Sequence, residues 1–163
     1  MIEIQDLHWR ALENQEALPE QVANWLIDTQ SLTAKLKDKY ADFQVRVINQ
    51  SEQAPDANER SSLPNIDNTI VREVALIGGG QTVVFARSVI PITSDTQAIL
   101  QIGAKPLGET LFNDPSIVRG ALEVTQSGDI WGRRSTFTLG QTPILVSEFF
   151  LEALYAWHAV FQA

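Results

Sequence analysis

Residues 71–91 read VREVALIGGGQTVVFARSVIP, and this stretch predicts two β-strands joined by a tight turn. β-Branched and aromatic residues dominate both halves, as is typical of strands. The three consecutive glycines from Gly78 to Gly80 can adopt the positive φ angles that a tight hairpin requires. A glycine run can also bind phosphate, but that needs a strand leading into a helix. Because another strand-like segment follows, we interpret these glycines as a turn.

Each strand of this hairpin places one arginine on a largely apolar face. In the strand predicted over 69–77, Arg72 alternates with apolar residues, but Glu73 does the same on the other face. In the strand predicted over 82–90, only Arg87 interrupts an apolar face, while small and polar residues take the other. The pattern therefore indicates that both arginines face the protein interior, and Arg87 more clearly than Arg72.

A strand predicted over 142–151 repeats the anomaly with the opposite charge. Both of its faces are largely apolar, so Glu148 lies in a poorly solvated environment on either one. Because an isolated buried charge is very costly, an ion pair between Glu148 and Arg72 or Arg87 is the simplest structural interpretation. Two arginines against one glutamate still leave a positive charge, which a ligand carboxylate could balance. The guanidinium fork suits carboxylates, so an enclosed site for a small organic anion is the second interpretation.

The rest of the chain mixes further strands with helices. Helical periodicity over 19–28, 31–40 and 96–113 predicts helices, the last of them divided at Gly103 and Pro106. Three more strands are predicted over 43–50, 116–127 and 135–139. The polar segment 51–68 is predicted to be a long loop, and 128–134 a connection. Six strands without regular helical crossovers favour an antiparallel α+β fold.

The strand predicted over 116–127 serves as a control for the inward arginines. Its apolar residues Val118, Leu122 and Val124 share one face, whereas Arg119 and Glu123 share the other. We therefore expect these two charges to lie on a solvated face.

Composition excludes several classes of function. The 163 residues suit one domain, and a net charge of −8 with a pI near 4.7 argues against nucleic acid as a partner. There is no cysteine, so disulfides and thiolate metal sites are excluded. His8 and His158 lie near opposite ends and no metal-binding motif is present. With no signal peptide and no apolar run near the length of a membrane span, we expect a soluble cytoplasmic protein.

Several motifs, in order, resemble the chorismate pyruvate-lyase (chorismate lyase) family. They are VRE at 71–73, ARSVIP at 86–91, KPLGETLF at 105–112, WGRRS at 131–135 and PILVSEFFL at 143–151, with WLIDTQSLT at 25–33. The resemblance implies one α+β domain over 1–163, with a six-stranded antiparallel sheet and a ligand buried beneath helical flaps. It also implies conversion of chorismate to 4-hydroxybenzoate and pyruvate for ubiquinone biosynthesis, without metal or cofactor.

The resemblance also assigns roles to individual residues. Arg72 is expected to grip the ligand carboxylate, and Glu148 to lie at the opposite end near the 4-hydroxyl; these two are the expected catalytic residues. Leu107 is expected to make a backbone contact in a flap. Leu32 stands where family members often carry methionine, which keeps an apolar contact. Arg87 is expected to help substrate access or to bind a second carboxylate.

A non-catalytic sensor is the alternative interpretation. Effector-binding domains of GntR-type regulators have a similar fold, and fold alone does not assign catalysis. Such a regulator needs a DNA-binding module, and residues 1–42 are too short and too acidic for one. The sequence therefore favours a monomeric enzyme that acts on chorismate and releases 4-hydroxybenzoate, with no nucleic-acid or membrane partner.

Overall fold

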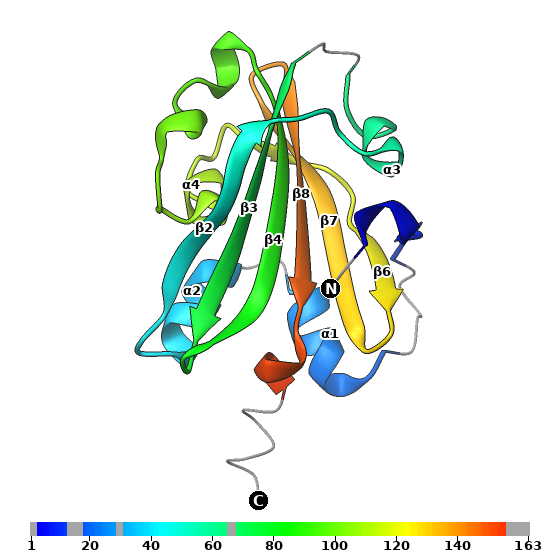
Figure 1. Cartoon of the computed structure of the whole chain (residues 1–163), viewed down its shortest axis with the longest axis vertical. Coiled ribbons are helices and arrows are strands. Elements are labelled where there is room, and N and C mark those ends of the chain that lie inside the picture. The colour runs from blue at the N-terminus through cyan, green and yellow to red at the C-terminus, as the bar shows by residue number, and fades with distance from the viewer. Residues whose placement is uncertain (1–2, 13–17, 29–30, 65–67, 156–163) are drawn as a thin grey trace, which may run out of the picture.

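One antiparallel sheet of eight strands organises the computed structural model, which describes residues 3–12, 18–28, 31–64 and 68–155 (Figure 1). The strand order is β1-β6-β7-β8-β4-β3-β2, and β5 pairs with β7. The strands are β1 (Arg10–Ala11), β2 (Gln44–Glu52), β3 (Thr69–Gly78), β4 (Gln81–Pro91), β5 (Val118–Arg119), β6 (Glu123–Ser127), β7 (Ile130–Leu139) and β8 (Thr142–Phe150). The predicted antiparallel α+β fold is confirmed. The count of six strands was too low, because the two-residue strands β1 and β5 are too short to show alternation.

Short helices lie on both faces of the sheet. The α-helices with both ends in the described ranges are α1 (Glu20–Leu26), α2 (Leu32–Lys39), α3 (Ala57–Arg60) and α4 (Leu107–Phe112), and residues 152–155 after β8 are also helical. Three 3₁₀ turns, η1 (Ile4–Asp6), η2 (Ser94–Thr96) and η3 (Ile99–Gln101), accompany them. The division of 96–113 at Gly103 and Pro106 is confirmed, since η3 ends before the first and α4 begins after the second. None of the helices in the described ranges is long and apolar enough to cross a membrane.

The glycine turn between β3 and β4 is confirmed. Gly79 and Gly80 have φ angles of 62° and 74°, values that residues with a side chain rarely adopt. The carboxylate of Asp42 accepts hydrogen bonds from both glycine N–H groups, at 2.9 and 3.0 Å. The glycines therefore close a hairpin whose two N–H groups are already occupied by a carboxylate of the same chain.

Helices α1, α2 and α4 pack on one face of the sheet, which we call the helix-covered face; in Figure 1 α1 and α2 lie behind the strands. Two apolar clusters fill the space between this face and the helices. They share large side chains of high burial: Trp25, Leu26, Leu36, Val84 and Phe150 in the first, and Ile90, Ile99, Leu107, Leu111 and Ile144 in the second. Burial of this apolar surface is the main stabilising contribution to the two-layer arrangement.

The other face, which we call the loop-covered face, is held to α3 by charge. Glu59 is 2% exposed. It accepts two hydrogen bonds from Arg87, from Nε at 2.9 Å and from Nη2 at 2.9 Å. Arg87 also contacts Glu73, its cross-strand neighbour, at 3.3 Å. Burial acts to lower the pKa of Arg87, but the hydrogen bonds and charge of Glu59, and those of Glu73, outweigh it and raise the pKa. The segment 51–68, predicted as a loop, thus contains a short helix anchored in the core.

The prediction for 116–134 was wrong in two respects. The single strand predicted over 116–127 is broken into β5 and β6, and the connection predicted over 128–134 is mostly β7. The close packing of Phe149 explains the glycine at position 132 of β7, because a Cβ there would lie 2.7 Å from the Phe149 ring. Glycine in a strand weakens the sequence pattern, but it allows a close approach of this kind.

We expect Glu59→Ala to destabilise the protein by about 3–5 kcal/mol, because removing one member of a buried ion pair leaves the other charge uncompensated. Urea unfolding followed by tryptophan fluorescence would measure the change. The double variant Glu59→Met/Arg87→Met should recover part of the loss, since neither buried charge then remains.

The matched control is Glu109→Gln, which breaks the exposed ion pair between Glu109 and Lys37. Exposed pairs contribute about 0–1 kcal/mol, so this variant should unfold almost as the parent does. Equal effects of Glu59→Ala and Glu109→Gln would contradict the anchoring role of Glu59.

Candidate functional site

A small cavity lies on the helix-covered face, between the centre of the sheet and α4. Its volume is about 30 Å³, which is room for one or two water molecules. Two charged residues, Arg72 and Glu148, line it from β3 and β8. The remaining lining residues are small or apolar: Thr33, Val74, Leu76, Ala86, Ser88, Pro106, Leu107, Gly108 and Val146.

Arg72 is a buried cation with an unused donor. It is 2% exposed, and the described residues provide it with no ion-pair partner. Nη1 donates to the Gln50 side chain at 2.9 Å and Nη2 donates to the Lys105 carbonyl at 3.0 Å. Nε has no acceptor in the described part of the chain. Burial lowers the pKa of Arg72. Since a buried donor without a partner is costly, an acceptor in the cavity would stabilise the site.

Glu148 is paired with Arg133, which the sequence interpretation did not consider. Arg133 Nε donates to Glu148 Oε1 at 2.9 Å. Its Nη1 lies within hydrogen-bonding distance of the carbonyls of Trp25, Leu26 and Asp28, at 3.0, 3.2 and 2.7 Å. One guanidinium therefore ties Glu148 to the C-terminal end of α1. The expected ion pair of Glu148 with Arg72 or Arg87 was wrong about the partner.

Strand register explains which residues meet. Residues directly opposite one another in a sheet point to the same face. One row across the helix-covered face joins Arg72 to Ser88, Ser88 to Val146 and Val146 to Ser135. We call it the arginine row.

The neighbouring row joins Val74, Ala86, Glu148 and Arg133 in the same way. Arg72 and Glu148 thus share a face, with only β4 between their strands.

The structure brings three of the five expected site residues to this cavity and separates the others from it. Arg72, Leu107 and Glu148 line it. Leu32 is the buried first residue of α2 and packs in the core beneath α1, while the next residue, Thr33, lines the cavity. Arg87 lies on the loop-covered face, because the register pairs it with Glu73 and Ser147. Both hairpin arginines are buried, as predicted, but they face opposite layers.

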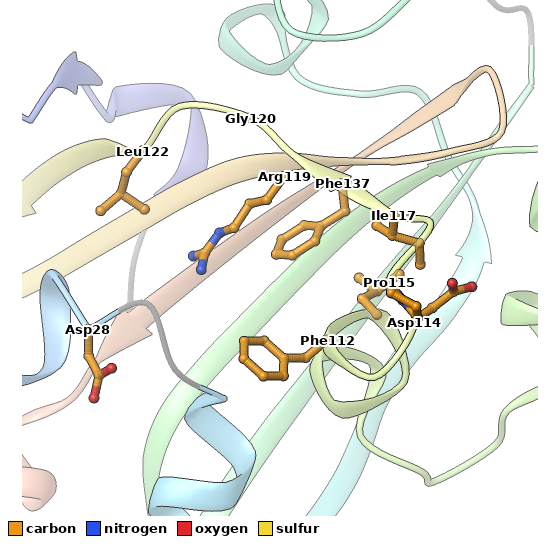
Figure 2. A pocket seen from close by; sticks show the side chains of 10 residues that line it. Asp28, Phe112, Asp114, Pro115, Ile117, Arg119, Gly120, Leu122 and Phe137 are labelled. Carbon is orange, nitrogen blue, oxygen red and sulfur yellow. The ribbon is translucent and has the colours of Figure 1, made fainter.

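A second cavity, of about 420 Å³, lies on the same face beside α4 (Figure 2). Arg119 and Phe137 line one side of it, and Leu111 and Phe112 of α4 line another. The guanidinium carbon of Arg119 lies 5.2 Å from the Phe137 ring centroid. Its Nε donates to Ser135 Oγ at 3.1 Å.

The position of Arg119 corrects the expectation of a solvated side chain, because β5 folds against β7 and turns it inward. Burial lowers the pKa of Arg119, and the positive charge of Arg133 lowers it further, whereas the charge of Glu148 acts in the opposite direction. Arg119 therefore lies within electrostatic reach of the first cavity.

The described ranges contain no group of three or more His, Asp or Glu side chains that could hold a metal ion. The charged side chains that line the two cavities are the arginines Arg72 and Arg119 and the carboxylates of Glu148, Asp28 and Asp114, among largely apolar walls. Such a site can bind an organic anion, orient it and accept or donate one hydrogen bond at its far end.

Comparison with known proteins identifies the family of this chain. The family model described as "Chorismate lyase" matches residues 3–160. A "Probable chorismate pyruvate-lyase" of Thiobacillus denitrificans is 35% identical over 160 residues, covering 83% of this chain and 85% of the relative. A "Chorismate pyruvate-lyase" of Pectobacterium atrosepticum is 31% identical over 144 residues, covering 85% and 81%.

The fold also has a counterpart of another kind. The crystal structure of a "possible transcriptional regulator", YydK of Bacillus subtilis, superposes with a TM-score of 0.50 over 78% of this chain and 63% of that chain, at 12% identity. At this identity the likeness concerns the fold alone. The match of the family model over nearly the whole length, together with relatives above 30% identity, shows that the chain belongs to the chorismate lyase family.

Proposed function

We propose that this protein is a chorismate pyruvate-lyase, which converts chorismate to 4-hydroxybenzoate and pyruvate. The observation that carries the proposal is that Arg72 and Glu148 line the same cavity. A buried guanidinium with an unused Nε–H can bind the ring carboxylate. A carboxylate on the same face, one strand further on, can accept a hydrogen bond from the 4-hydroxyl at the other end of the ring.

The reaction is an elimination that makes the ring aromatic. The bond between ring C3 and the ether oxygen breaks, and the hydrogen on C4 leaves as a proton. The methylene carbon of the departing enolpyruvyl group gains a proton and becomes the methyl group of pyruvate. Because aromatisation drives the reaction, the main task of the protein is to hold the enolpyruvyl group over C4 in a reactive pose.

Each site residue has a role in this proposal. Arg72 fixes the carboxylate end of the ring, and Glu148 fixes the hydroxyl end, with Arg133 holding the glutamate in place. Leu107, at the first turn of α4, closes the cavity from above. Leu32 acts indirectly, by packing the start of α2 so that Thr33 lines the cavity. Arg87 holds α3 and does not touch the ligand.

The first cavity must enlarge to take a ring acid. A volume of about 30 Å³ is far below the 300–1,000 Å³ of typical ligand sites. Lys105 and Pro106 lead into α4, and the Lys105 carbonyl accepts a hydrogen bond from Arg72. In our proposal this segment and α4 form a flap that moves outward when a ligand enters and closes over it. Product release from so enclosed a site would then limit turnover.

A ligand sensor is the competing function, because the fold resembles that of a possible transcriptional regulator. Adding chorismate to the purified protein and following pyruvate and 4-hydroxybenzoate distinguishes the two. Formation of both products supports the lyase, whereas binding of chorismate without either product supports the sensor. The proposal further includes a monomeric state in the cytoplasm and a role in ubiquinone biosynthesis.

Arg72→Lys should raise the KM for chorismate by roughly 10- to 100-fold, because lysine keeps the charge but loses the fork that binds a carboxylate with two hydrogen bonds. Steady-state kinetics would measure it. The dissociation constant of 4-hydroxybenzoate should rise in parallel, since the ring carboxylate is common to both ligands. An unchanged affinity for both would remove Arg72 from the site.

Glu148→Gln should lower kcat by less than roughly 10-fold, because a glutamine can still hydrogen-bond the 4-hydroxyl while the proton of C4 passes to the departing group. General acid–base catalysis by Glu148 would instead contribute roughly 10²- to 10⁴-fold. Glu152→Gln, at an exposed position just after β8, is the control. A loss of 100-fold or more in Glu148→Gln alone would show that Glu148 transfers the proton.

A further inference from the structure

The arginine row has a cation at each end and small side chains between them. Arg72 occupies one end, on β3. At the other end Ser135 accepts a hydrogen bond from Arg119 Nε at 3.1 Å. The floor between them consists of Ser88, Val146 and Ser135 on three adjacent strands. Strands in a sheet are about 4.8 Å apart, so the two guanidiniums lie on either side of a floor that is three strands wide.

Two guanidiniums on this side of the sheet have no carboxylate partner in the described part of the chain. Arg72 and Arg133 are buried, and Arg119 and Glu148 are half-buried. Of the three arginines only Arg133 forms an ion pair, with Glu148, so Arg72 and Arg119 are left without one. On the loop-covered face, by contrast, Arg87 and Arg134 each pair with a glutamate.

Two other carboxylates line the second cavity, and both have other partners. Asp28 forms an ion pair with Lys35 at 3.0 Å. Asp114 is exposed, and its Oδ1 accepts hydrogen bonds from the backbone and side chain of Ser116 at 3.0 and 2.6 Å. Neither carboxylate forms an ion pair with Arg119, which has no such partner among the described residues.

Arg119 is held in a fixed orientation by neutral groups. The Ser135 hydroxyl takes its Nε and the Phe137 ring lies against its guanidinium. Figure 2 shows the guanidinium extending into the cavity. No hydrogen bond to a described residue engages Nη1 or Nη2. This is the arrangement in which a guanidinium can offer its outer edge to a carboxylate.

We propose that Arg119 binds the second carboxylate of the substrate, the one on the enolpyruvyl group, and that the second cavity receives the pyruvate formed from it. The inference rests on the proposed lyase function and adds a subsite to it. With Arg72 on the ring carboxylate, the two guanidiniums that lack an ion-pair partner match the two carboxylates of the substrate. After the reaction, the carboxylate of pyruvate is bound by Arg119 and the carboxylate of 4-hydroxybenzoate is bound by Arg72.

Helix α4 supports the division of the two subsites. Leu107 lines the first cavity and Leu111 the second, and both are buried. Residues four apart lie on the same side of a helix, so one face of α4 covers both cavities.

The test uses the difference between substrate and product, because 4-hydroxybenzoate lacks the second carboxylate. In Arg119→Gln the KM for chorismate should rise by roughly 10- to 100-fold, the range expected for losing hydrogen bonds to a charged group. The dissociation constant of 4-hydroxybenzoate, measured by calorimetry, should change less than about twofold. Arg119→Lys should restore part of the affinity for chorismate, because it restores the charge.

The matched control is Arg46→Gln, which removes one positive charge from an exposed position on β2. It should leave the KM for chorismate unchanged, and this separates a local contact from a general change in the field of the protein. Added pyruvate should inhibit the parent enzyme more than Arg119→Gln, because its carboxylate uses the same guanidinium.

Outcomes that overturn the inference are distinct from those that overturn the function. If the parent protein forms 4-hydroxybenzoate and Arg119→Gln has an unchanged KM, the second subsite is wrong and the lyase proposal stands. Equal losses of chorismate and 4-hydroxybenzoate binding in Arg119→Gln, without recovery in Arg119→Lys, would also overturn it. If the parent protein forms no product, both proposals fall together.

Discussion

The guanidinium of Arg133 connects the sheet to the helices that cover it. It bonds Glu148 on β8 and the last carbonyls around α1 at once, so the carboxylate in the cavity and the helical layer above it share one support. Carbonyls at a helix C-terminus lack partners within the helix and attract cations. The contacts of Arg133 have two effects: the half-buried Glu148 gains a countercharge, and α1 gains a C-terminal cap. The position of Glu148 depends on this contact.

The two faces of the sheet use arginine in opposite ways. On the loop-covered face, Arg87 and Arg134 are matched by Glu59 and Glu123, and the adjacent residues Asn58 and Glu59 of α3 supply contacts to both arginines. On the helix-covered face Arg133 pairs with Glu148, but Arg72 and Arg119 have no ion-pair partner among the described residues. Alternation along a strand sends neighbouring residues to opposite faces, so one sheet can carry a closed ion-pair network on one side and an open cationic site on the other.

The sequence predicted the hairpin, its glycine turn, the burial of Arg72 and Arg87 and the poorly solvated position of Glu148, because alternation and turn chemistry are local properties. It did not predict which face each arginine would occupy, since that depends on what packs on each side. Arg133 was missed because Gly132 and the polar neighbours around it weaken the strand pattern. Arg119 was assigned to solvent because β5 is too short to be recognised, and its inward direction arises only from pairing with β7.

The pattern of residues did not show that Arg72 and Glu148 lie at one site. The resemblance to the family implied it. It also associated Arg87 with the ligand, and the register of β4 places that side chain on the other side of the sheet. The periodicity of the sequence could identify charged residues that face the interior, and the resemblance to the family could imply which of them belong to a ligand site. The three-dimensional pairing of strands was needed to separate Arg72 and Glu148, which line one cavity, from Arg87, which holds α3 to the sheet.

The guanidiniums of Arg72 and Arg119, which lack an ion-pair partner in the described part of the chain, belong to a molecule whose formal net charge is −8. At low ionic strength the net charge of the protein dominates its field away from the surface, and an approaching anion is repelled. An anion is attracted only close to the two cavities, where the guanidiniums of Arg72 and Arg119 dominate the local field. Moderate salt would screen the repulsion more than the enclosed contacts, so capture of an anionic ligand should become faster as ionic strength rises from a low value. This is the reverse of the salt dependence of electrostatically steered association.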